Sequence, residues 1–257
     1  MNHIHPTAVI DPGVKIADDV RIGPYAVIGE GVELASGVEI GSHAHLEGST
    51  VIGAATRVFP FAVIGAEPQV RDFSGPTTAL VIGRNNVIRE FAAIHVGTVD
   101  GGGCTRIGDD NLIMNNVHVA HDCQIGSHCI IATFTALAGH VVVEDHVVFG
   151  AMTGVHQFAR IGESAFTGAN SMIAKDTPPF SRVAGDRARF MGMNTIGLER
   201  REFAAETIET LRHAFHLLFH SKLRLEPALA RVEQECAGPE VDRLLSFLRT
   251  SERGFIR

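Results

Sequence analysis

The sequence predicts an all-β solenoid, a parallel β-helix of hexapeptide repeats, followed by an α-helical cap at the C-terminus. Aliphatic residues recur every six positions over most of the first 175 residues, and six is not a helical period. The 257-residue chain has 27 glycines, one tyrosine and no tryptophan, which suits narrow layers of small and branched side chains. Beyond that region the apolar spacing changes to steps of three and four, which is typical of amphipathic helices.

The six-residue period runs in three stretches. The first comprises Ile4, Ile10, Ile16, Ile22, Ile28, Leu34, Ile40, Leu46, Ile52, Val58 and Ile64. The period restarts at Ile82, Ile88 and Ile94, shifts by one residue, and continues through Ile107, Ile113, Val119, Ile125, Ile131, Leu137, Val143, Phe149, Val155, Ile161, Thr167 and Ile173. Each unit predicts a short strand with one inward residue and a corner with a small residue, so three units form one triangular coil. Equivalent strands of successive coils then stack into parallel sheets.

Two insertions interrupt the period, at about residues 66–80 ("AEPQVRDFSGPTTAL") and 97–105 ("GTVDGGGCT"). Loops that project from a rigid scaffold commonly carry binding residues. A disordered surface loop is the alternative interpretation of each insertion.

The period ends at "DTPPF", where Pro178 and Pro179 remove two donors from a sheet ladder. We therefore expect a solenoid domain over residues 1–180 and a helical domain over residues 181–257. In the helical domain one apolar stripe predicts a first helix through Phe203, Thr207, Ile208, Leu211, Phe215, Leu218 and Phe219. Pro227 suits the first turn of a second helix, and the pair Gly238-Pro239 separates it from a third.

Charge and cysteine usage narrow the function class. The formal net charge of −7 argues against non-specific binding of nucleic acid or of an anionic membrane surface, because both require a broad positive field. No apolar run approaches the roughly 18 residues needed to span a bilayer. The four cysteines form no CxxC pair, and the N-terminus does not resemble a signal peptide. We therefore expect reduced thiols in the cytoplasm.

The stretch "NNVHVAHDCQIG" (115–126) places an aspartate directly after the second of two histidines. Since Val119 is the inward residue of its unit, His118 and His121 must point outward or toward a corner. Steps of one coil stack His121 and Asp122 first on Gly139 and His140 and then on His156 and Gln157.

Three interpretations of this column remain open. An imidazole oriented by a carboxylate can act as a general base toward a hydroxyl. Three imidazoles could instead bind Zn²⁺ and activate water, as in a zinc-dependent hydratase of the hexapeptide carbonic anhydrase type. The histidines could also be a structural ladder in a non-enzymatic scaffold.

Several motifs extend over nearly the whole chain: "IHPTAVI", "GPTTALVIGRNNVIREFAAIHVGTVDGGG", "DDNLIMNNVHVAHDC", "ALAGHV", "GAMTGVHQFARIG", "DTPPF", "GLERREF" and "RGFIR". In this order the chain closely resembles the acyl-carrier-protein-dependent UDP-N-acetylglucosamine O-acyltransferases that open lipid A biosynthesis. The resemblance implies a left-handed solenoid, whereas the usual crossover preference alone would favour a right-handed one. It also implies a homotrimer with active sites between adjacent subunits. Neither a metal nor a cofactor is implied, because the phosphopantetheine of acyl carrier protein supplies the acyl group.

The resemblance assigns roles to particular residues. His121 is the general base that takes the proton from the sugar 3-hydroxyl, Asp122 orients it, and the backbone N–H of Gly139 stabilises the oxyanion. Ala169 is the residue that measures acyl length. Residues implied to line the substrates are His95, His118, His140, His156, Gln157, Asn194, Arg200 and Arg201.

Five positions depart from the family's usual pattern: Val70, Asp72, Val96, Ile196 and Glu199. Val70 replaces an acid and Asp72 replaces a lysine, beside Arg71, so that the basic contact of the first insertion is displaced. These departures leave open a variant that acylates a 3-amino sugar and forms an amide.

Overall fold

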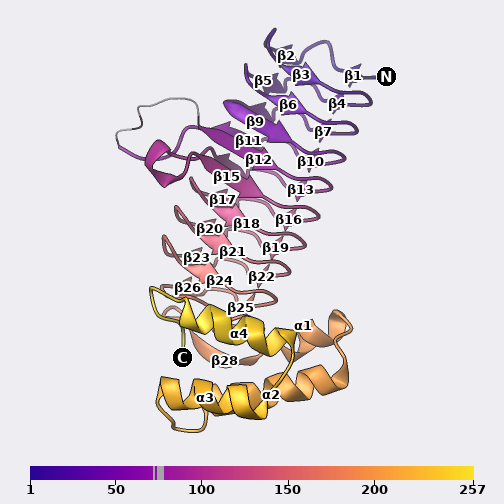
Figure 1. Cartoon of the computed structure of the whole chain (residues 1–257). Helices are drawn as coiled ribbons and strands as arrows, with labels where there is room; N and C mark the ends of the chain where they lie inside the picture. Colours follow the sequence, from indigo (N-terminus) through magenta and orange to yellow (C-terminus); the bar gives the residue numbers. More distant parts are fainter. Residues whose placement is uncertain (72, 74–77) are drawn as a thin grey trace.

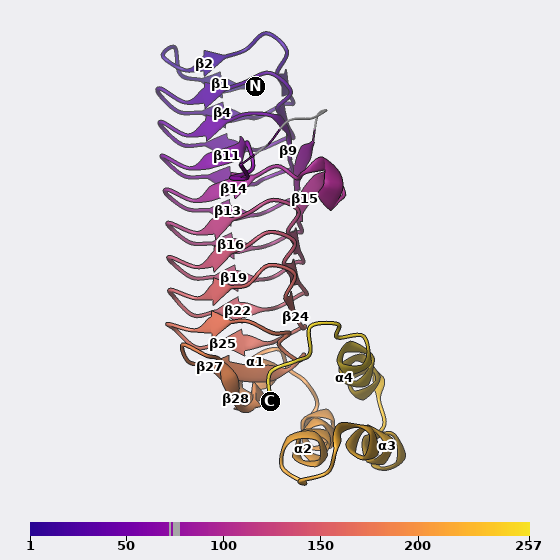
Figure 2. The ribbon, with the colours of Figure 1, turned by 90° about the vertical axis from the view of Figure 1, so that its left-hand side faces the viewer.

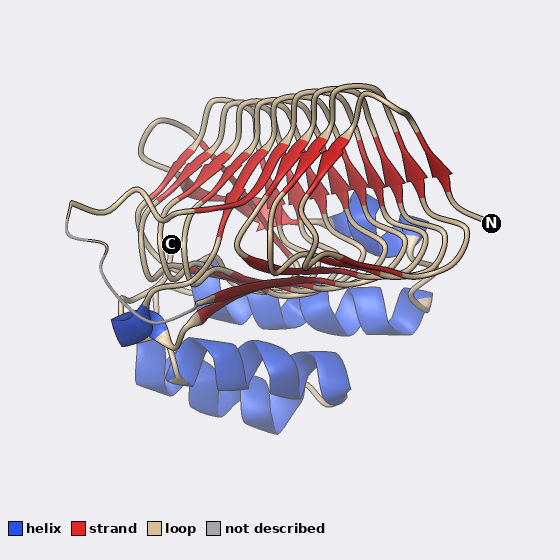
Figure 3. Cartoon of the chain, turned by 90° about the horizontal axis from the view of Figure 1, so that it is seen from above, coloured by secondary structure: helices blue, strands red, loops and turns tan. Residues whose placement is uncertain are grey.

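Short strands of successive coils pair in parallel in this computed structural model, which describes residues 1–71, 73 and 78–257. His118 pairs with Ala136, and Ala136 pairs with Gly154, so each coil without an insertion advances the chain by 18 residues. The coils stack along one axis (Figure 1), and the view from above shows three strand layers around a common interior (Figure 3). The six-residue period of the sequence therefore corresponds to one strand and one corner, and three such units form a coil.

The strands form three sheets, here named A, B and C. Sheet A contains β1 (His3–Ile4), β4 (Arg21–Ile22), β7 (Glu39–Ile40), β10 (Arg57–Val58), β13 (Val87–Ile88), β16 (Leu112–Ile113), β19 (Ile130–Ile131), β22 (Val148–Phe149), β25 (Phe166–Thr167), β27 (Ser181–Ala184) and β28 (Arg189–Met193). Sheet B contains β2 (Val9–Ile10), β5 (Val27–Ile28), β8 (His45–Leu46), β11 (Val63–Ala66), β14 (Ala93–His95), β17 (His118–Val119), β20 (Ala136–Leu137), β23 (Gly154–Val155) and β26 (Met172–Ile173). Sheet C contains β3 (Lys15–Ile16), β6 (Glu33–Leu34), β9 (Ser49–Ile52), β12 (Ala79–Ile82), β15 (Cys104–Ile107), β18 (Gln124–Ile125), β21 (Val142–Val143) and β24 (Arg160–Ile161).

The predicted inward positions form the core from Ile22 onward, and all of them are buried. Ile4 is 44% exposed, and Ile10 and Ile16 are half-buried. These three residues belong to the first coil, which has a neighbouring coil on one side only. The solenoid is left-handed and ends in C-terminal helices, which confirms the predicted fold class.

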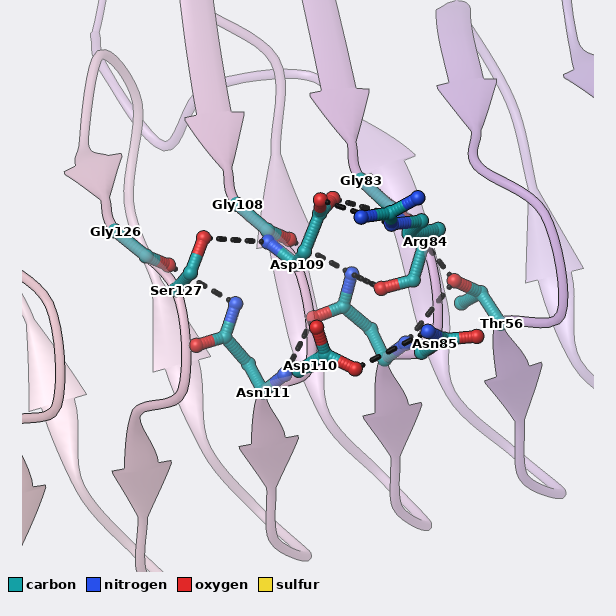
Figure 4. Close-up of polar contacts among 11 residues, drawn as sticks. Thr56, Gly83, Arg84, Asn85, Gly108, Asp109, Asp110, Asn111, Gly126 and Ser127 are labelled. Carbon is teal, nitrogen blue, oxygen red and sulfur yellow. Dashed lines mark hydrogen bonds and ion pairs between the residues drawn. The ribbon is translucent and has the colours of Figure 1, made fainter. Parts of the chain in front are cut away.

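Buried asparagines stabilise the corner between sheets C and A. The side-chain N–H of Asn86 donates to the carbonyl of Gly108 (2.8 Å), and its side-chain oxygen accepts from the N–H of Asn111 (2.9 Å). Asn111 repeats the pattern one coil later, donating to Gly126 (3.0 Å) and accepting from the N–H of Cys129 (2.7 Å), as Figure 4 illustrates for the Asn111–Gly126 contact. The amides thereby satisfy corner backbone groups that the sheets leave unpaired.

Sheet A continues past the proline pair at which we expected the solenoid period to stop. Thr177 still bridges to Ile161, and β27 pairs in parallel with β25 before β28 returns antiparallel. Pro178 and Pro179 lie between these pairings, at a turn where no ladder donor is required. Both β27 and β28 were missed by the sequence analysis.

Four helices follow: α1 (Thr195–Arg200), α2 (Ala205–Phe219), α3 (Leu225–Glu235) and α4 (Pro239–Arg249). They lie at the C-terminal end of the coil stack (Figures 1 and 2). The last three match the predicted helices, with Pro227 in the first turn of α3 and Pro239 in the first turn of α4, whereas α1 was not predicted. Leu211, Leu229 and Leu244 form part of a second apolar core among these helices. Within the described residues no helix has the length and apolar character needed to cross a membrane.

Candidate active site

Both insertions and the histidine column lie along the edge where the chain passes from sheet B to sheet C, here named the B–C edge. The first insertion connects β11 to β12, and the second connects β14 to β15 through a 3-10 helix, η1 (Val99–Gly101). His121 and Asp122 connect β17 to β18 at the same corner of the next coil. Figure 1 accordingly shows η1 on the same side of the stack as β17 and β20.

His121 and Asp122 form a hydrogen-bonded dyad on this edge. The Nδ1–H of His121 donates to Oδ2 of Asp122 at 2.8 Å. The Asp122 side chain is 1% exposed and that of His121 is 18% exposed, so the carboxylate is buried behind a ring that ligands can reach. A carboxylate on Nδ1 fixes the tautomer in which Nε2 has a free lone pair. This arrangement suits a general base.

Left-handed backbone at the corners explains why the rings stack. Asp122, His140 and Phe158 have φ values of 59°, 61° and 63° at equivalent corner positions. The His140 ring packs edge-on against His121, with centroids 5.0 Å apart, and stacks face-on with Phe158 at 4.4 Å. The predicted 18-residue column is therefore present, with Phe158 as an additional member.

Gly139 allows the His121 ring to pack directly against the backbone of the next coil. A Cβ at Gly139 would lie 2.7 Å from Nε2 of His121, closer than side-chain carbons approach other atoms. Among the described residues the N–H of Gly139 donates to no protein acceptor. This N–H belongs to a buried residue that packs against the His121 ring, so a backbone donor lies beside the candidate base, as an acyl-transfer site requires.

Two further histidines lie one above the other on sheet B. The His95 ring is 5.0 Å from that of His118. Nδ1–H of His95 donates to the carbonyl of Glu67 in the first insertion at 2.7 Å, and its buried Nε2 has no partner among the described residues. Burial, and to a smaller extent His95, lowers the pKa of His118. His156 and Gln157 are exposed farther along the B–C edge, where Nδ1 of His156 bonds the carbonyl of Gln157 at 3.0 Å.

The ligand atoms of His121, Asp122 and His140 lie within 4.8 Å of one another, so they could be considered for a metal site. The set differs from the three imidazoles expected for a hydratase. Moreover, Oδ2 of Asp122 accepts from His121, and both carboxylate oxygens accept from the N–H of Thr98. A metal would have to displace these donors, so the residues fit a proton-transfer dyad better than a zinc site.

A second set of predicted residues lines a cavity of about 600 Å³ between the outer face of sheet A and α1. Asn194 caps α1, its Oδ1 accepting from the N–H of Gly197 (3.2 Å) and its Nδ2 donating to the carbonyl of Ser164 (2.9 Å). Arg200 is exposed at the cavity. Arg201 pairs with Glu163 at 2.9 Å and also donates to Ser164.

The sequence analysis did not assign other residues of this cavity. His128 and His146 stack with centroids 4.7 Å apart, and Arg182 also lines the cavity. Burial and the Arg201 charge lower the pKa of His146. The spacing of 18 between the two histidines was a signal that could have identified them.

The two sets occupy different edges of the prism. The cavity lies at the corner between sheets C and A and includes neither His121 nor another member of the B–C edge. Ala169 lies at the third edge, between β25 of sheet A and β26 of sheet B, and is exposed. One protomer therefore does not bring Arg200 to His121.

Residues 3–36 and 104–139 match the bacterial hexapeptide transferase repeat, and residues 176–256 match the family described as UDP N-acetylglucosamine O-acyltransferase, domain 2. Acyl-[acyl-carrier-protein]–UDP-N-acetylglucosamine O-acyltransferases from Myxococcus xanthus and Verminephrobacter eiseniae are 47% and 48% identical to this chain, each alignment covering 100% of both proteins. The chain belongs to the UDP-N-acetylglucosamine O-acyltransferase family. A solved UDP-N-acetylglucosamine acyltransferase from Bacteroides fragilis superimposes with a TM-score of 0.96 at 39% identity, covering 99% of this chain and 100% of that chain.

Membership in the acyltransferase family confirms the resemblance and makes the protein an enzyme. Four of the five departures from the family pattern fall on described residues. Val96 is buried beside His95, Ile196 lines the cavity at 58% exposure, and Val70 and Glu199 are exposed. Asp72 lies outside the described residues. The sequence analysis also missed Thr98 and Thr105, which contact Asp122.

Proposed function

We propose that this enzyme transfers a 3-hydroxyacyl group from acyl carrier protein to the 3-hydroxyl of UDP-N-acetylglucosamine, the first step of lipid A biosynthesis. The observation that carries the proposal is the His121–Asp122 dyad, with the His121 ring packed against the backbone of Gly139. Relatives at 47–48% identity over the full length carry the name of this activity. We also propose a cytoplasmic location, in which its cysteines remain reduced.

His121 starts the proposed reaction as general base. Its Nε2 accepts the proton of the sugar hydroxyl while the oxygen bonds to the thioester carbonyl carbon. The buried Asp122 carboxylate, 2.8 Å from Nδ1, stabilises the imidazolium. The Gly139 N–H stabilises the oxyanion. When the C–S bond breaks, the imidazolium returns the proton to the phosphopantetheine thiolate, so no separate cofactor is required.

The remaining predicted residues bind substrates in this proposal. At the B–C edge these are His95, His118, His140, His156 and Gln157; the buried Nε2 of His95 has no partner among the described residues. Arg200 contacts the diphosphate, since a guanidinium offers a charge-assisted fork to phosphate oxygens. Arg201 supports that site through its ion pair with Glu163, and Asn194 shapes it by capping α1.

We further propose that three copies assemble so that each active site combines two protomers. If sheet B of one protomer faces sheet A of the next, the B–C edge of the first meets the cavity of the second. This arrangement places the edge between sheets A and B at the threefold axis. That edge carries an exposed column of stacked rings from Tyr25 through His43 and Phe61 to Phe91, with centroid separations of 5.0–5.3 Å. Exposed apolar columns of this kind are typical of interfaces.

Apolar character of the two facing sheets supports the same arrangement. Ile130, on the outer face of sheet A, and Met172, on the outer face of sheet B, are 37% and 54% exposed. From β13 to β25 the outer positions of sheet A are all apolar, namely Val87, Leu112, Ile130, Val148 and Phe166, whereas those of sheet C from β15 to β24 are Arg106, Gln124, Val142 and Arg160. Burying sheets A and B while leaving sheet C in water is therefore the favourable choice.

Acyl transfer with purified protein tests the function. The protein is incubated with a panel of hydroxyacyl carrier proteins and either UDP-N-acetylglucosamine or its 3-amino analogue, and mass spectrometry detects the acylated nucleotide. Ester formation supports the proposal, and amide formation with the 3-amino analogue alone would reassign the acceptor. If no acylated product forms and CO₂ hydration is sensitive to chelators, the zinc hydratase is supported. If the protein shows neither activity, the scaffold interpretation remains.

A further inference from the structure

Thr98, in the second insertion, makes three hydrogen bonds to the buried carboxylate of Asp122. Its backbone N–H donates to both oxygens at 3.0 Å, and its hydroxyl donates to Oδ2 at 2.6 Å. Asp122 is also fixed from the other side, since its own N–H donates to the hydroxyl of Thr105 at 2.8 Å. The carboxylate orientation therefore depends on the insertion as well as on the coil.

The oxygen that accepts from the Thr98 hydroxyl is the same one that accepts from His121. Oδ2 of Asp122 receives Oγ1–H of Thr98, the N–H of Thr98 and Nδ1–H of His121. Each donor draws negative charge from that oxygen, so each weakens its attraction for a positive imidazolium. The Thr98 hydroxyl thus competes with His121 for one acceptor.

Glycines allow the insertion to approach the dyad so closely. A Cβ at Gly101 would lie 2.1 Å from Oδ2 of Asp122 and 2.6 Å from Cε1 of His140, and one at Gly97 would lie 2.7 Å from Oδ1 of Asp122. The backbone of η1 consequently covers the carboxylate directly and shields it from water. This close approach is what brings the Thr98 hydroxyl within 2.6 Å of the carboxylate.

We propose that Thr98 is a positioning residue that sets the basicity and orientation of His121 through the shared oxygen of Asp122. The inference rests on the proposed role of His121 as general base. When the hydroxyl is absent, Oδ2 attracts the imidazolium more strongly, so the protonated ring is stabilised relative to the neutral ring. His140, the other titratable neighbour of the ring, is unchanged by the substitution.

The test compares Thr98→Val, which removes the hydroxyl but keeps its shape, with Thr98→Ser, which retains it. A matched control is Thr153→Val, because Thr153 is buried in the solenoid interior and its hydroxyl donates to the Gly150 carbonyl at 2.7 Å. For Thr98→Val we expect kcat to fall about 10- to 100-fold, because the carboxylate that orients His121 loses one of the hydrogen bonds that fix its own position. The acid limb of the kcat/KM pH profile should move to higher pH. Thr98→Ser and Thr153→Val should keep the wild-type profile.

Histidine titration in the substrate-free protein separates this inference from the proposed function. With ¹³C-labelled histidine, the His121 signal is assigned by its loss in His121→Ala and followed against pH. An upward shift in Thr98→Val that Thr98→Ser reverses supports the inference, even if wild-type protein fails to transfer acyl groups and the proposed function is lost. An unchanged His121 titration in Thr98→Val overturns the inference, as does a lower melting temperature with an unchanged pH profile.

Discussion

Mixed oligomers of two inactive variants should recover activity if each site combines two protomers. His121→Ala removes the base from the B–C edge, and Arg200→Ala removes a guanidinium from the cavity at the other edge. Each variant alone should be inactive or nearly so. In a heterologous ring, however, a site that takes His121 from an Arg200→Ala protomer and Arg200 from a His121→Ala neighbour is complete.

The arrangement fixes the expected magnitude. In an equal mixture each half-site is intact with a probability of one half, so about one quarter of the sites are complete in randomly assembled rings. The two variants are co-refolded, the oligomer mass is confirmed by light scattering, and acyl transfer is measured. A matched control mixes His121→Ala with the double variant and should recover nothing. If mixed oligomers of trimeric mass show no more activity than the single variants alone, the shared site is refuted.

The other predictions concern single properties of the same molecule. His121→Ala should lower kcat by about 10²- to 10⁴-fold with a melting temperature close to wild type, because this ring lies at a corner, 18% exposed, and is not part of the apolar core; a folded variant with normal turnover would remove His121 from the mechanism. Burial lowers the pKa of His118, so the unfolded chain binds a proton that the folded chain does not. The resulting stability is present above pH about 6.5 and is lost as pH falls through the lowered folded pKa; His118→Gln should therefore flatten the acid decline in melting temperature, and an unchanged decline would exclude His118 as its cause. Charge reversal at Lys222 and Arg224, which are exposed between α2 and α3, should weaken binding of the acidic carrier protein and reduce its salt dependence in titrations, whereas salt-independent binding would contradict an electrostatic patch. Ala169→Gly should shift preference toward longer acyl chains and Ala169→Met toward shorter ones, since each buried methylene is worth about 0.8 kcal/mol; an identical ranking of carriers for all three proteins would place the acyl chain elsewhere.

The positions of side chains could be predicted from the sequence wherever the hexapeptide repeat is uninterrupted, because spacing along the chain then determines which residues are neighbours in space. A residue six places from another occupies the next sheet, and one 18 places away lies on the next coil. For that reason the stacking of His121 on Gly139 and His140 could be predicted without a structure. The same arithmetic applies to His128 and His146, whose stacking was available from the sequence although it was not assigned.

Where the repeat is interrupted, the sequence lost its predictive power. Thr98 lies 24 residues before Asp122, and only the path of the second insertion brings its hydroxyl to the carboxylate. Strands β27 and β28 were missed because the proline pair was interpreted as the end of the solenoid, whereas the prolines fall at a turn. Neither feature has a periodic signal, because each depends on a loop conformation that long-range contacts select.

The shape of a prism explains the roles of the insertion and of the second protomer in the proposed site. Each corner of a triangular coil is convex, so the His121 edge offers a substrate one wall and little shelter from water. The second insertion adds a cover over Asp122 through Thr98 and Gly101, which keeps the carboxylate buried while the imidazole remains reachable. The insertion covers one side of the His121 edge and leaves the opposite side without a wall. The cavity beside α1, which contains arginine side chains, lies at another corner of the prism and therefore cannot form that wall within the same chain. In the proposed trimer a neighbouring copy would present this cavity and supply both the missing wall and the diphosphate contacts, so assembly and catalysis should be lost together.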